Sequence, residues 1–170
     1  QEVRVASNDD SSLQWTVGAF YFEQDIDTVE HWSANGDSLV DGVYLPHITE
    51  QAFFGEVTYQ ISDQWSVTAG GRWFDNTFEF EIPVFEGILI GDPSPTPLLE
   101  ETSSSFTPKV SVSYFANEDI HFYATAAEGF RVGQINFGAT PANGIPVSFD
   151  PDSLWNYELG MKSIWQEGRI

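Results

Sequence analysis

The sequence has no cysteine, a single methionine and few basic residues. Without cysteine there are neither disulfides nor thiolate chemistry, so cysteine usage does not identify the redox compartment. Six Lys and Arg residues stand against 26 Asp and Glu residues, which gives a formal net charge of −20. Binding of nucleic-acid phosphates needs clustered cations, so we expect no nucleic-acid partner. The same shortage argues against a basic patch for anionic lipid surfaces.

Long hydrophobic runs and catalytic motifs are also missing. No apolar run approaches the roughly 18 residues that indicate a transmembrane helix. The sequence contains no phosphate-binding loop, dinucleotide fingerprint or nucleophile elbow. Its three histidines do not have the spacing of metal ligands. We therefore expect no enzyme activity, no catalytic residues, no cofactor and no metal site.

What the sequence does contain is alternation of apolar and polar residues with a period of two, which is typical of half-buried β-strands. Hydrophobic residues make up 41% and aromatic residues 15%, so a disordered chain is not expected. Near the end of the chain, for example, Trp155, Tyr157 and Leu159 alternate with Asn156 and Glu158. Seven segments behave in this way: Gln1–Ala6, Leu13–Gln24, Glu50–Ile61, Gln64–Asn76, Ser103–Phe115, Ile120–Gly129 and Leu154–Trp165.

The connections between these segments alternate between short and long. The long stretches cover about residues 25–49, 77–102 and 130–152, and each lies between two short turns along the chain. Outer-membrane barrels have short periplasmic turns, longer extracellular loops and strands that alternate apolar-out and polar-in. The sequence therefore predicts an all-β fold, an antiparallel meander of about seven strands that forms part of a large transmembrane β-barrel.

Aromatic residues gather near both ends of the predicted strands. Bilayers favour such amphipathic rings at their two interfaces, whereas aromatic residues are also common in any strand. We expect one belt beside the short turns, made of Trp65, Tyr114, Tyr123 and Trp165, and another near the long stretches, made of Tyr21, Trp73, Phe106 and Trp155.

Five strings appear in an order and spacing that resemble the middle of the barrel domain of TonB-dependent receptors, with most similarity to the branch of iron-complex or broad-substrate receptors. They are AFFGEVTY at 52–59, VTAGGRW at 67–73, FTPKVS at 106–111, YATAAEGFRVG at 123–133 and LWNYELGMK at 154–162. The resemblance implies a barrel of about 22 strands with a plugged lumen. It implies that residues 1–170 are a section of one barrel domain without the plug domain, and that the protein resides in the bacterial outer membrane.

The resemblance also implies function and partners. We expect part of a receptor that takes up a scarce nutrient, an iron–siderophore type of complex, by energised transport. The expected partners are outer-membrane lipid, the remainder of the barrel and its plug, the TonB complex through the missing plug region, and a small-molecule substrate such as a ferric chelate. The alternative is a soluble, secreted all-β binding module, an adhesin or a carbohydrate-binding domain.

Charged residues on the polar side of the strands give candidates for a lumen-facing surface. A lysine or arginine facing hydrocarbon at mid-membrane would cost about 2–4 kcal/mol, so such charges should face the lumen. They could contact the plug, or they could form wall salt bridges with no transport role. The candidates are Glu56, Arg72, Lys109, Glu158 and Lys162.

Four residues of the long stretches are candidate substrate contacts. His31, Trp32 and His47 lie in the first long stretch among several acidic residues, and Arg131 lies where the third begins. A cation or ferric chelate could meet His31, Trp32 and His47 there, and the alternative is that they are solvated loop residues. Arg131 could contact the substrate at the rim.

Overall fold

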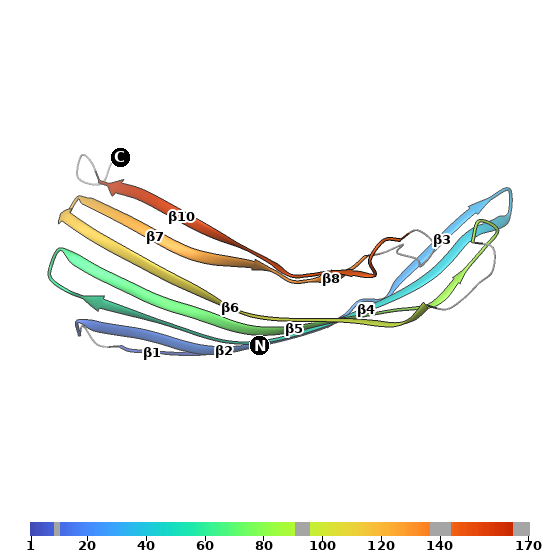
Figure 1. Cartoon of the computed structure of the whole chain (residues 1–170), viewed down its shortest axis with the longest axis horizontal. Coiled ribbons are helices and arrows are strands. Elements are labelled where there is room, and N and C mark those ends of the chain that lie inside the picture. The colour runs from blue at the N-terminus through green and yellow to red at the C-terminus, as the bar shows by residue number, and fades with distance from the viewer. Residues whose placement is uncertain (9–10, 91–95, 137–143, 165–170) are drawn as a thin grey trace.

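The computed structural model is a curved antiparallel sheet, shown in Figure 1. It describes residues 1–8, 11–90, 96–136 and 144–164, and the side chains of residues 96 and 97 are not described. The strands are β1 Glu2–Ala6, β2 Leu13–Asp25, β3 Thr28–Ala34, β4 Asp37–Gln60, β5 Trp65–Glu86, β6 Thr96–Asn117, β7 Ile120–Arg131, β8 Gln134–Ile135, β9 Ser148–Phe149 and β10 Asp152–Ser163.

The main sheet follows chain order. Its strands lie in the order β1-β2-β4-β5-β6-β7-β10, with β3 paired to β4 outside this path, while β8 and β9 form a separate two-stranded ribbon. Every pairing is antiparallel. The predicted all-β antiparallel meander of about seven strands is therefore confirmed.

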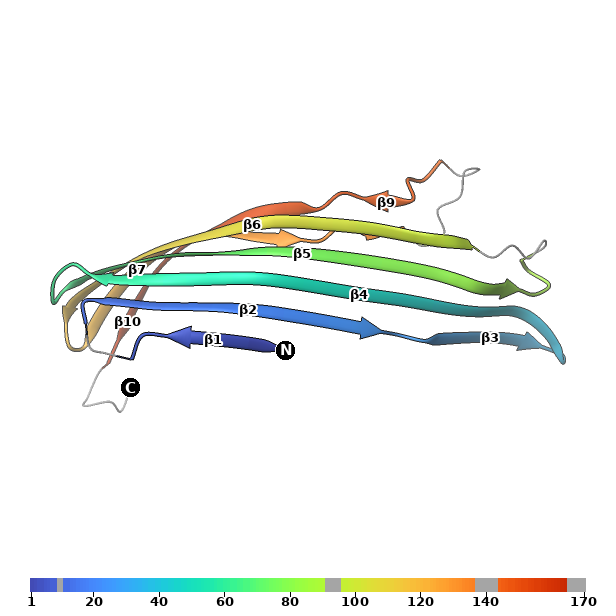
Figure 2. The same ribbon diagram turned by 90° about the horizontal axis from the view of Figure 1, so that it is seen from below.

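Short turns gather at one end of the sheet. The turns β4–β5 and β6–β7 lie at the left of Figure 1, where β2 also begins, whereas the β3–β4 hairpin extends to the right. Figure 2 shows β2, β4 and β5 running side by side, with the shorter β1 along the edge of the sheet. This one-sided arrangement is the one that the spacing of the alternating segments predicts.

The first two long stretches differ from the prediction because most of their described residues continue the strands. β4 has 24 residues, and β5 and β6 have 22 each, well beyond the predicted segment ends. The hairpin between β3 and β4 closes at Asn35 and Gly36. Their φ angles of 55° and 89° fit a two-residue turn with both central residues in the left-handed region. We call the part of the structure formed by residues 23–50, 75–90 and 96–104 the extension.

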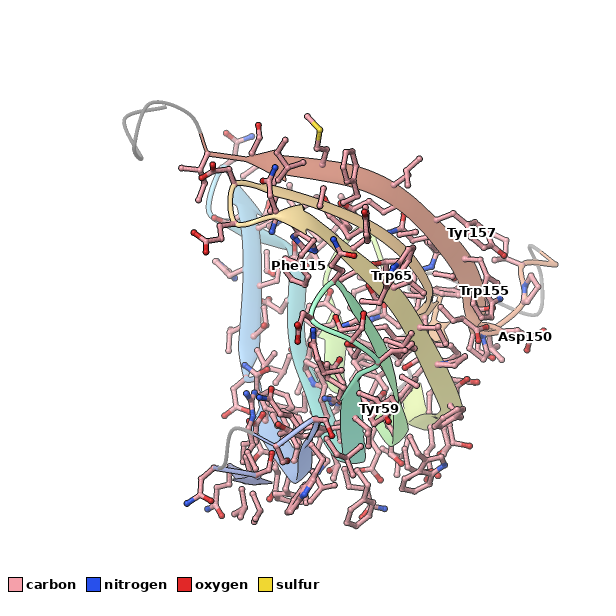
Figure 3. The ribbon with its side chains drawn as sticks, turned by 90° about the vertical axis from the view of Figure 1, so that its left-hand side faces the viewer. Tyr59, Trp65, Phe115, Asp150, Trp155 and Tyr157 are labelled. Carbon is pink, nitrogen blue, oxygen red and sulfur yellow. The ribbon has the colours of Figure 1, made fainter. Side chains whose placement is uncertain are left out.

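The two faces of the sheet differ in polarity over residues 52–73 of β4 and β5 and their neighbours. On the convex face, large apolar side chains are exposed, with Leu159 at 84%, Tyr157 at 75% and Phe53 at 61%. Figure 3 shows Trp155 and Tyr157 on the outside of the curve, whereas Phe115 lies on the inside. Because side chains alternate along each strand, the concave face receives the polar partners.

Aromatic rings border this apolar band. Toward the short turns, the rings of Trp65 and Tyr114 lie 4.6 Å apart, and toward the extension those of Phe53 and Trp73 lie 6.1 Å apart. The span 65–73 of β5 falls within the roughly 9–11 residues that a transmembrane strand needs. Trp165, a predicted member of the first belt, lies outside the described residues.

The polarity reverses in the extension. There the concave face carries the small core of Phe78, Phe80 and Ile135, all buried, while acidic residues such as Glu79 lie on the convex face. Ile135 reaches this core because the chain after β7 crosses the concave face, where the backbone amide of Gly133 donates to Ser103 Oγ at 3.1 Å. The described residues contain no helix that could cross a bilayer.

Candidate binding surface on the concave face

The strand register places Glu56, Arg72 and Lys109 on the concave face. Lys109 Nζ of β6 lies 2.8 Å from Glu56 Oε2 of β4, with β5 between them. Gly70 of β5 is the register partner of both residues, so the pair spans a strand that has no side chain at that point. A Cβ at Gly70 would lie 2.7 Å from the Gly55 carbonyl oxygen, so close approach of β4 requires glycine there.

Arg72 forms the second pair of this surface. Its Nη2 lies 2.5 Å from Glu50 Oε1, and its guanidinium stands 5.1 Å from the centroid of the Phe20 ring. Hydrogen bonding to a carboxylate and stacking on a ring fix the plane of the guanidinium. Arg72 is therefore held in place on the wall.

Glu158 and Lys162 lie together on β10, away from the first three candidates. Tyr123 Oη donates to Glu158 Oε1 at 2.5 Å, and Lys162 Nζ stands 5.5 Å from the centroid of the Tyr123 ring. The structure therefore divides the five predicted residues into two groups, one across β4–β6 and one across β7–β10.

Two adjoining cavities open on the first group. One, of about 290 Å³, is lined by Glu50, Arg72, Phe74, Thr107, Glu128, Gly129, Phe130 and Val132. The other, of about 300 Å³, is lined by Thr16, Phe54, Gly55, Glu56, Gly70, Gly71, Arg72, Thr107, Pro108, Lys109, Ala127 and Glu128. Arg72, Thr107 and Glu128 line both, so the cavities share a wall.

Glu128 is a lining residue that the sequence does not predict. The last register pair between β7 and β6 joins Ala127 to Lys109, and beyond it the end of β7 leans over the concave face. There the ring of Phe130 lies 4.6 Å from that of Phe74 on β5. The alternation of side chains along a strand does not predict this contact, because the contact forms only where β7 separates from β6.

The candidate substrate contacts of the first long stretch lie in strands. His31 of β3 pairs with Asp41, and Trp32 beside it is 56% exposed. His47 of β4 lies on the convex face, where its Nδ1 is 2.7 Å from Asp25 Oδ1. The structure does not bring these residues to the cavities.

Arg131 ends β7 and forms an ion pair with Asp152, which begins β10. Its Nε donates to Asp152 Oδ1 at 3.1 Å. Arg131 therefore links the end of β7 to the beginning of β10.

The electrostatics of His47 are set by neighbouring carboxylates. The hydrogen bond to Asp25 is the main cause that raises the pKa of His47 above 6.5, and Glu79, with its Oε2 4.0 Å from Nε2, adds to it. Partial desolvation acts in the opposite direction. Among the described residues, no three His, Asp or Glu side chains gather as a metal site would require.

Comparisons with known proteins agree with this architecture. The family described as TonB dependent receptor-like, beta-barrel matches residues 3–170. The crystal structure of the ferric yersiniabactin uptake receptor FyuA from Yersinia pestis is similar over 95% of this chain, with a TM-score of 0.77 and 15% identity. The match covers 25% of that receptor, so the chain spans about a quarter of its length.

Proposed function

Because the chain belongs to the family of TonB-dependent receptor-like β-barrels, we propose that it forms a section of the wall of an outer-membrane receptor. Members of this family are transporters of the bacterial outer membrane rather than enzymes. The observation that supports the wall assignment most directly is the convex apolar face with its two aromatic borders. A continuous apolar face of this kind marks a surface that contacts lipid or protein.

The single layer of the main sheet and the aromatic borders of its convex face favour contact with lipid over packing against a second sheet. A secreted binding module would cover exposed Leu159 and Tyr157 with a packed partner sheet. Among the described residues the main sheet forms a single layer, and β8 with β9 lies at the extension. The aromatic borders also follow the interfaces of a bilayer, which a sandwich core does not require.

The concave face then faces a lumen. Glu56, Arg72, Lys109, Glu158 and Lys162 line it, and the remainder of the barrel and a plug complete the transporter. β1 and β10 each pair with one neighbour in the main sheet, so further barrel strands would flank both edges. The TonB complex acts through the plug region of the whole receptor.

The proposed cargo is an iron chelate of the siderophore type, taken up by energised transport. The structurally similar protein from Yersinia pestis is a ferric yersiniabactin uptake receptor, which supports this class of cargo. Trp32, His31, His47 and Arg131 remain candidate contacts at the extracellular side. Trp32 is the most available of them, because His31, His47 and Arg131 already pair with carboxylates.

Spin labels test the lipid assignment. The chain has no cysteine, so single cysteines can be introduced at Val67 and Ala69 of the convex face and at Thr68 of the concave face. In vesicles that contain the whole receptor, convex labels should relax faster with oxygen and the concave label faster with a water-soluble nickel complex. Equal accessibility at all three positions would refute the wall assignment.

Uptake measurements test the cargo. Cells that depend on the whole receptor should accumulate radiolabelled iron from one or more ferric chelates, and uptake should cease when the TonB complex is removed. Uptake of a sugar or peptide with no uptake of any ferric chelate would refute the iron assignment and leave the wall assignment intact.

A further inference from the structure

The cavities under the end of β7 have an excess carboxylate. Arg72 is matched by Glu50 at 2.5 Å, and Lys109 is matched by Glu56 at 2.8 Å. Glu128 lines both cavities, and within the described parts of the chain it has no hydrogen bond or ion pair. Both basic side chains that line the cavities, Arg72 and Lys109, therefore already pair with a carboxylate. Glu128 is available to bind a positively charged group of a ligand.

Two aromatic residues line the first cavity together with Glu128. Phe74 is buried at 6% exposure, its ring lies 4.6 Å from Phe130, and both residues line the first cavity with Glu128. A carboxylate next to phenyl rings suits a cationic head on an apolar stem, because the rings attract the cation and cover the stem. The cavity volume of about 290 Å³ lies just below the roughly 300–1,000 Å³ of small-molecule pockets, which suits one arm of a cargo rather than a whole drug-sized molecule.

The approach to the cavities has the same sign. Residues 22–51 and 74–105, which include the extension, contain no lysine or arginine and many Asp and Glu residues. Such a field raises the local concentration of cations and repels anions. Glu79 and Glu81 lie on the convex face, whereas the register places Glu101 on the concave face opposite Phe78. Glu101 therefore adds negative charge on the concave side along which a positively charged cargo would approach Glu128.

We propose that the cavity formed where the end of β7 leans over β5 binds a cationic group of the cargo, a primary ammonium on an apolar stem, with Glu128 as its counter-ion beside Phe74 and Phe130. This inference rests on the proposed function and narrows the cargo to molecules that carry an amine arm. In a ferric chelate, the amine would be a substituent outside the iron-binding groups. Arg72 holds Glu50 and lines the cavity, and Glu128 accepts the hydrogen bonds of the ammonium group.

Three small probes that differ in charge test the site directly. Calorimetric titration of the whole receptor in detergent would compare 2-phenylethylammonium with neutral 2-phenylethanol and anionic phenylacetate. Hydrogen bonds to charged groups are the stronger ones, so the ammonium probe should bind about tenfold or more tightly than the other two. Equal affinity for all three, or preference for the anion, would overturn the proposal.

Matched variants locate the binding. Glu128→Gln removes the charge and keeps the shape, and it should weaken the ammonium probe about tenfold while leaving phenylethanol unchanged. Glu118→Gln in the exposed turn between β6 and β7 makes the same change in net charge at the opposite end of the sheet and should have no effect. Equal loss in both variants would point to bulk charge and overturn the site.

The cargo itself provides the last comparison. A ferric trihydroxamate chelate with a free amine should compete with the ammonium probe, whereas the same chelate with an acetylated amine should not. If no probe binds and Glu128→Gln destabilises the whole receptor, a lysine or arginine of the receptor itself occupies the cavity, and the small-molecule proposal fails. That failure differs from failure of the wall assignment, which the spin labels decide independently.

Discussion

A positive charge at Val110 should destabilise the receptor strongly because of where this residue lies in the sheet. Val110 is on the convex face of β6, midway between Phe106 and Tyr114, and is 49% exposed. It pairs with Ala69 on one side and Ala126 on the other, so the apolar face continues around it. If this face contacts lipid, Val110 lies near the bilayer midplane.

The expected cost of Val110→Arg follows from that depth. Arginine facing lipid at the midplane costs about 2–4 kcal/mol, and the cost falls to about 0–1 kcal/mol near the interfaces. The unfolding equilibrium would therefore shift by roughly 30-fold to 700-fold, at about 1.4 kcal/mol for each factor of ten. Lys109, the preceding residue, avoids this cost because it faces the opposite side and pairs with Glu56.

Chemical unfolding of the whole receptor in lipid vesicles, followed by tryptophan fluorescence, would measure the change. Gln51→Arg is the matched control, because Gln51 also lies on the convex face but beyond the aromatic border, opposite Asp75. The control should cost at most about 1 kcal/mol. Equal costs at Val110 and Gln51 would show that the convex face does not contact a hydrocarbon layer and would refute the reasoning.

Three further predictions concern packing, ion pairing and pH. Gly70→Ala should destabilise the sheet by about 1–3 kcal/mol in chemical unfolding, because the added Cβ lies 2.7 Å from a backbone oxygen of β4. A double-mutant cycle on Glu56 and Lys109, whose side chains are 44% and 45% exposed, should give a coupling of about 0.2–1 kcal/mol. An NMR titration should find the His47 pKa above 6.5, and Asp25→Asn should lower it. The stabilisation from this pair is full below the unfolded pKa and is lost as pH rises through the raised pKa.

Controls exist for each of these predictions. Gly55→Ala places its Cβ at 3.4–3.5 Å from its neighbours, an ordinary contact, and should have little effect. If Gly55→Ala and Gly70→Ala cost the same, close strand approach is not the cause. A coupling between Glu56 and Lys109 above about 2 kcal/mol would mean that another part of the receptor buries the pair, since exposed pairs contribute less. A His47 pKa that does not respond to Asp25→Asn would contradict the assigned hydrogen bond.

The sequence by itself determined the strand type, the number of main strands and the end at which the short turns gather. A period of two separates the two faces of a strand without any knowledge of its neighbours. For this reason the alternation alone assigns Trp155, Tyr157 and Leu159 to the face opposite Glu158, and the register agrees. The family resemblance followed from the order of five short strings, and the family match over residues 3–170 confirms it.

The sequence was less informative about the extension, because the polarity of the faces reverses there. Residues 75–81 of β5 alternate in the structure, but Asp75, Glu79 and Glu81 occupy the face that is apolar nearer the short turns. The alternation that marks a lipid-facing strand stops where the polarity of the two faces reverses. For this reason the sequence predicts loops where the structure has the extension. Pairing with the neighbouring strand, which the sequence does not show, is what keeps these residues extended.

The concave surface was decided by tertiary structure. The sequence placed Glu56, Arg72 and Lys109 on one face, but their pairing depends on register across three strands, and a single-residue shift would send each side chain to the other face. Glu128 and Phe130 joined this surface because the end of β7 separates from β6 and leans inward. Alternation within a strand is a local property, whereas separation of two strands depends on everything packed around them, so only the folded sheet could bring Glu128 and Phe74 to one cavity.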